Sequence, residues 1–75
     1  MKINKEQFDE VEKAYAWELL RDNNAKFGRV FLTAYPNIRQ ALADDGDHGI
    51  ADLMIIWSES NVDKARELVK KWVDE

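Results

Sequence analysis

Residues 50–57, IADLMIIW, form the most apolar stretch of the chain and decide how the rest of it is interpreted. With the 3.6-residue period of an α-helix, the large side chains of this stretch fall on one continuous face: Ile50, Leu53, Met54 and Trp57. Ile56 and Ala51 flank that face. Such a helix needs partners around most of its circumference. We therefore expect it to be the central element of one small core.

The length and composition predict one domain spanning 1–75. Seventy-five residues lie near the lower limit for a core that lacks disulfides and metals, and the chain has no cysteine. A net charge of −4 disfavours binding to nucleic acid and to anionic membranes. No apolar run is long enough for a membrane span, and the first ten residues lack the apolar core of a signal peptide. We expect a soluble cytoplasmic protein.

The first predicted helix begins after Asn4, which forms a capping-box pattern with Gln7, and it runs to about Asp22. Its expected buried stripe is Phe8, Val11, Tyr15 and Leu19. Trp17 lies roughly opposite this stripe. It either packs on a second neighbour or stacks against Arg21, or it serves as an anchor for a binding partner.

Residues 25–35 are compatible with a helix or with a buried strand. As a helix, the segment places four apolar residues on one face: Phe27, Val30, Phe31 and Ala34. Gly28 weakens the helical interpretation. The helix is favoured because the apolar spacing continues through Ile38 and Leu42, with Pro36 expected as the first residue of a short helix over 36–43.

Residues 44–49 are predicted to be a loop because they combine two glycines with three acids. Ser60 and Asp63 form a second capping-box pattern. The final helix is expected over about 61–74, with a stripe of Val62, Ala65, Leu68, Val69, Trp72 and Val73.

The predicted fold class is all-α, a small bundle of four to five short helices. The alternative is an α/β fold with strands near 29–35 and 52–58. Two strands make a poor sheet in isolation, so that version would need additional strands from a dimer mate. All-α is the better interpretation.

The sequence offers little for catalysis or for binding a metal or cofactor. An EF-hand beginning at Asp44 would place Gly46, His48 and Ile55 where oxygen ligands are required. His48 is the single histidine, and the glycines match no phosphate-binding pattern. We expect no enzyme activity, no cofactor, no metal and no small-molecule substrate.

A DNA-binding helix-turn-helix is also disfavoured. The candidate second helix, 49–58, would present Asp52 rather than basic or amide side chains to the major groove. A loose group of basic residues, Lys26, Arg29 and Arg39, has acidic neighbours.

The main functional hypothesis is a protein-interaction module. Four large apolar residues fall outside the main stripes of their helices: Trp17, Leu20, Leu32 and Ile55. If they form an exposed patch, that patch marks an interface. The simplest partner is a second copy, because small oligomers are mostly symmetric dimers.

The alternative hypothesis is an acidic inhibitor or nucleic-acid mimic that blocks a basic groove on another protein. Its support is the acidic surplus and the group Asp44, Asp45, Asp47 and Asp52. In size and composition the chain resembles small, acidic, helical proteins of phages and mobile elements. The inhibitor hypothesis is tested by the salt dependence of binding to a partner protein.

Overall fold

The computed structural model describes residues 2–74 and confirms the all-α prediction. The elements follow in the order β1 (Ile3–Asn4), α1 (Lys5–Arg21), α2 (Phe27–Ala34), α3 (Pro36–Asp44), α4 (Gly46–Ser58), α5 (Val62–Lys70) and β2 (Val73–Asp74). The α/β alternative is wrong, because residues 29–34 of the first proposed strand lie in α2 and the whole of the second, 52–58, lies in α4. Within the described range, no helix has the length and apolar character that crossing a bilayer requires.

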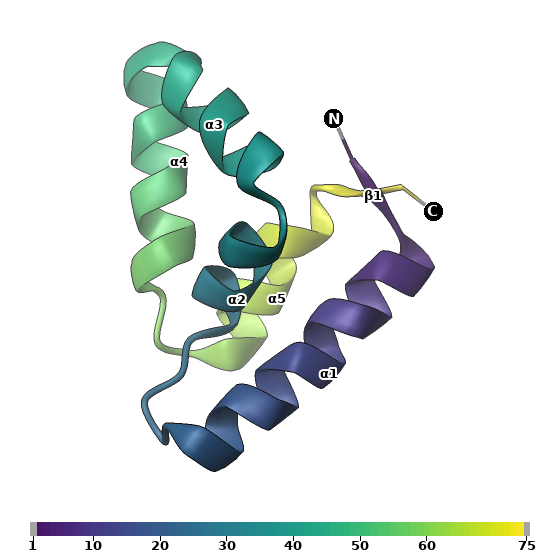
Figure 1. Ribbon diagram of the computed structural model, residues 1–75. Helices are drawn as coiled ribbons and strands as arrows, with labels where there is room; N and C mark the ends of the chain where they lie inside the picture. Colours follow the sequence, from purple (N-terminus) through teal and green to yellow (C-terminus); the bar gives the residue numbers. More distant parts are fainter. Residues whose placement is uncertain (1, 75) are drawn as a thin grey trace.

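The centre of the molecule is α2, which packs against each of the other four helices. It buries Phe27, Phe31 and Leu32 almost completely. The long helix α1 and the helix α4 lie on opposite sides of it (Figure 1). Leu32, expected outside the stripe of its helix, is therefore a core residue, because α2 has neighbours on more than one face.

The prediction that residues 50–57 form the central element is wrong. Ile50 and Met54 are exposed, and Ile56, expected only to flank the buried face, is buried. The reason is the orientation of α4 about its own axis, in which Gly49 faces α3 and Ile56 faces α2. A helix that is apolar nearly all round does not reveal from its own sequence which face will be covered.

Two glycines set the close spacing of the helices around α4. A Cβ atom at Gly28 would overlap the carbonyl oxygen of Ile56, and one at Gly49 would overlap that of Leu42. The backbones of α2 and α3 therefore approach α4 directly at these two points. Gly28 weakens the helical propensity of α2 but permits its packing against α4.

The α1 helix follows its prediction closely. The Asn4 side chain accepts the Gln7 backbone N–H at 2.7 Å, and the Gln7 side chain accepts the Asn4 backbone N–H, which completes the capping box. Val11 is buried. Phe8 and Tyr15 pack on Phe27 of α2, with ring centroids 5.8 and 5.5 Å apart. This aromatic contact joins α1 to the core.

The loop predicted over 44–49 is wrong. The α3 helix continues through Asp44, and α4 begins at Gly46. The chain reverses at Asp45 and Gly46, where Gly46 has a φ of 75°, a conformation that glycine adopts without strain. Three acidic side chains therefore sit on a tight helix–helix corner.

The last helix is shorter than predicted at its C-terminal end. Its N-cap is Asn61 rather than Ser60, and its last residue is Lys70. Residues 73–74 instead form β2, which pairs in parallel with β1 and aligns Ile3 with Val73. The Ile3 N–H donates to the carbonyl oxygen of Trp72 at 2.7 Å. This pairing joins the two ends of the described chain (Figure 1).

Candidate interaction surfaces

The largest hollow described lies between α1 and α2, and we call it the α1–α2 groove. Its volume is about 630 Å³. The groove is lined by one face of each helix and by the turn between them: Ala14, Trp17, Glu18, Asp22, Asn24, Ala25, Lys26, Arg29, Val30, Thr33 and Ala34. Trp17 is 68% exposed in it. The surface thus combines small and apolar residues with a large accessible indole.

The turn between the two helices fixes the end of this groove. Asp22 caps α1, and its carboxylate accepts the Asn24 N–H at 2.9 Å. The Ala25 N–H donates to the carbonyl oxygen of Asp22 at 3.0 Å. Lys26 is the N-cap of α2, and its side chain makes no capping bond. The backbone of the turn is therefore fixed locally.

The two edges of the α1–α2 groove carry opposite charges. Glu18 and Asp22 lie on the α1 edge, and Lys26 and Arg29 lie on the α2 edge. Glu18 pairs with Arg21 at 3.4 Å in an exposed contact. Within residues 2–74, neither Lys26 nor Arg29 forms an ion pair. The basic edge is thus available to carboxylates from outside the chain.

Arg29 is held in place by Trp57 of α4. Its Nε–H donates to the carbonyl oxygen of Trp57 at 3.1 Å, and its guanidinium lies 5.1 Å from the centroid of the Trp57 ring. Arg39 of α3 lies 5.7 Å from the same ring. These cation–π contacts join three helices and explain why Trp57 is half-buried. They also fix the position of Arg29 at the groove.

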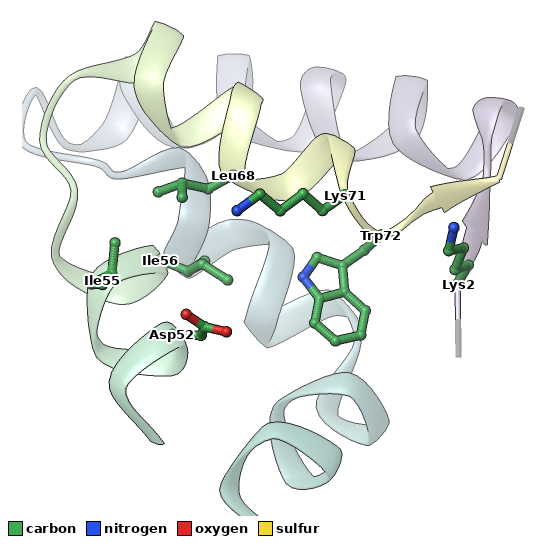
Figure 2. A pocket seen from close by; sticks show the side chains of 7 residues that line it. All are labelled: Lys2, Asp52, Ile55, Ile56, Leu68, Lys71 and Trp72. Carbon is green, nitrogen blue, oxygen red and sulfur yellow. The ribbon is translucent and has the colours of Figure 1, made fainter. Parts of the chain in front are cut away.

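A second, smaller hollow lies where α4, α5 and the residues after α5 meet (Figure 2). Its volume is about 200 Å³. The Asp52 carboxylate and the Trp72 indole face it from opposite sides, with Ile56 between them and the Lys71 chain above. This volume is smaller than the roughly 300–1,000 Å³ of typical ligand pockets. The α1–α2 groove falls within that range.

The structure does not bring the predicted partner-binding residues together. Trp17 lines the α1–α2 groove, and Leu20, 79% exposed, lies one turn farther along α1. Ile55 and Asp52 line the smaller hollow and belong to α4, which lies on the opposite side of α2 from α1 (Figure 1). The three remaining acids are exposed around the α3–α4 corner: Asp44, Asp45 and Asp47. The stacking partner suggested for Trp17, Arg21, pairs with Glu18 in the structure.

Residues that share a surface with Trp17 were missed by the sequence reasoning. Lys26 and Arg29 belonged only to a loose basic group, and Val30 was assigned to a buried face. Their spacing along α2 is helical, but nothing local relates them to Trp17. The signal that places them there is the short turn after Asp22, which folds α2 back beside α1.

Among residues 2–74, no three or more His, Cys, Asp or Glu side chains are grouped closely enough to hold a metal ion. The fold and the grooves together define a small five-helix protein with an open, amphipathic surface between its first two helices. Comparison of the chain with known protein families, with curated proteins and with solved structures finds no match.

Proposed function

We propose that the chain is a cytoplasmic, non-enzymatic protein-interaction module that binds through the α1–α2 groove. The observation that carries the proposal is Trp17, a large apolar side chain that the fold leaves 68% exposed in a groove between two helices. Tryptophan is among the residues most enriched at the energetic centres of protein interfaces.

Trp17 contributes little hydrophobic stabilisation within the monomer, because most of its side chain stays in water. Burying a large apolar side chain stabilises a fold by about 1.5–3 kcal/mol. The core obtains this contribution from Phe27, Phe31 and other residues, whereas Trp17 and Leu20 remain largely in water. A partner that covers them supplies the missing burial. The polar edges of the groove then provide orientation and specificity.

A photo-crosslinking amino acid at Ala14, an exposed position that lines the groove about one turn before Trp17, tests the proposal in the native cells while Trp17 stays in place. We expect a discrete covalent adduct whose mass identifies the bound protein. The matched control carries the same amino acid at Gln40, an exposed position on α3 that lines none of the hollows described. The proposal fails if position 14 gives no adduct, or if both positions give the same set of adducts.

A further inference from the structure

We infer that the partner seated on the α1–α2 groove is a second copy of this chain, related by a two-fold axis that runs along the groove. This inference rests on the proposed function and names its partner. It follows from the distribution of charge on the groove: Glu18 and Asp22 on one edge, Lys26 and Arg29 on the other.

A symmetric dimer places the same surface of both copies face to face. When the two-fold axis runs along the groove, the α1 edge of one copy faces the α2 edge of the other. Acidic groups then meet basic groups on both sides. When the axis runs across the groove, acidic edges face acidic edges and basic edges face basic edges, which is strongly unfavourable. The charges therefore select a single orientation.

The charges also match in register along the groove. Asp22 and Lys26 flank the turn between the helices, and Glu18 and Arg29 lie about one helical turn away from it. A two-fold rotation about an axis along the groove does not change the distance of a residue from the turn, measured along the groove. Asp22 of one copy thus meets Lys26 of the other, and Glu18 meets Arg29.

The same orientation provides contacts for Trp17. It lies on α1, so in the dimer it faces α2 of the other copy. The α2 surface there carries Val30, Thr33 and Ala34, and the latter two are exposed in the monomer. Side chains of this size leave room for an incoming indole. Two tryptophans are covered in one symmetric contact.

Sedimentation equilibrium of two charge-reversed variants tests the inference. Asp22→Lys places two lysines opposite each other at both symmetric contacts, and Lys26→Glu does the same with two acids. Each variant alone is expected to dimerise at least about tenfold more weakly than the wild-type chain. An equimolar mixture is expected to restore the dimer. In the mixed dimer the two reversed side chains face each other with opposite charges, and the second contact is the native pair.

Lys5→Glu serves as the matched control. It makes the same change of charge at the start of α1, outside the lining of the groove, and is expected to dimerise like the wild-type chain. Circular dichroism checks folding. If Asp22→Lys loses helicity, Asp22→Asn replaces it, because the amide oxygen still accepts the Asn24 N–H. Mixing with Lys26→Glu is then expected to give a weaker but measurable recovery.

The inference is overturned by a wild-type chain that is monomeric at all concentrations, by a Lys26→Glu variant that dimerises normally, or by a mixture that does not recover. A monomeric chain that crosslinks through position 14 to a different protein would overturn the second-copy inference alone. Absence of any specific crosslink would overturn the proposed function itself.

Discussion

At the scale of single residues, Gly28 shows how one side chain can decide the packing of two helices. The sequence marks it as a weak point in α2, because glycine costs about 1 kcal/mol relative to alanine in a helix. The structure shows the carbonyl oxygen of Ile56 in the space that a Cβ would occupy. This requirement depends on a residue far away in the chain. Reasoning from local sequence could therefore not identify it.

We predict that Gly28→Ala destabilises the protein by about 1–3 kcal/mol, because α2 and α4 must separate to accept the methyl group. Chemical denaturation followed by circular dichroism measures this change. The sign of the change in unfolding free energy is diagnostic, since Gly→Ala at a helical position with open space around it would stabilise the protein. Gly46→Ala provides a comparison in which the cost comes from the positive φ, because no atom lies within 4 Å of its Cβ position. A stabilised Gly28→Ala variant would contradict the close packing.

At the scale of elements, prediction succeeded where one helix face is clearly apolar and failed where it is not. The α5 helix has a narrow stripe, and Ala65 and Val69 on it are buried as expected. The α4 helix has apolar groups nearly all round, and its orientation was predicted wrongly. The end of α5 was also wrong, because residues 73–74 pair with residues 3–4 at the opposite end of the sequence.

One contact between elements that periodicity did not identify is the ion pair of Arg66 with Glu12. The guanidinium of Arg66 on α5 donates to both carboxylate oxygens of Glu12 on α1, at 2.7 and 3.1 Å. Both side chains are about one-third exposed. The hydrogen bond with Glu12 raises the pKa of Arg66. The stabilisation linked to this shift is fully present below the ordinary pKa of arginine and is lost only in strong alkali.

We predict that Glu12→Gln destabilises the fold by about 1 kcal/mol, since a bidentate, partly shielded pair contributes more than a surface contact. The loss of unfolding free energy should be the same just below and just above neutral pH. Glu10→Gln on the same helix is the control. Its pairing with Lys13 is a single 3.5 Å contact between exposed groups, so its effect should stay within about 0.3 kcal/mol. Equal losses in urea denaturation of the two variants would contradict a specific role for the Arg66 pair.

At the scale of the whole molecule, sequence reasoning predicted the helical class and placed Trp17 opposite the buried stripe of its helix. It did not decide whether Trp17 is exposed, or to which surface it belongs. Ile55 and Asp52 belong to α4, which lies on the opposite side of α2 from α1 (Figure 1), and the three corner acids line neither the groove nor the smaller hollow. The acidic inhibitor hypothesis stays a prediction from composition. Predicting a groove between helices requires knowing how the helices pack against each other, and local sequence patterns do not contain that information.

The most direct test of the account is the thermal midpoint Tm of the wild-type chain and of Trp17→Ser, measured over about a hundredfold range of concentration. An interface residue stabilises only the assembled state, so the wild-type Tm should rise with concentration while that of the variant stays constant. At the lowest concentration the two should coincide. A difference of 1 kcal/mol corresponds to about 4–8 °C in a domain of this size. A variant with a lower Tm at every concentration would show that Trp17 supports the monomer fold. A wild-type Tm that is independent of concentration would contradict the second-copy interface.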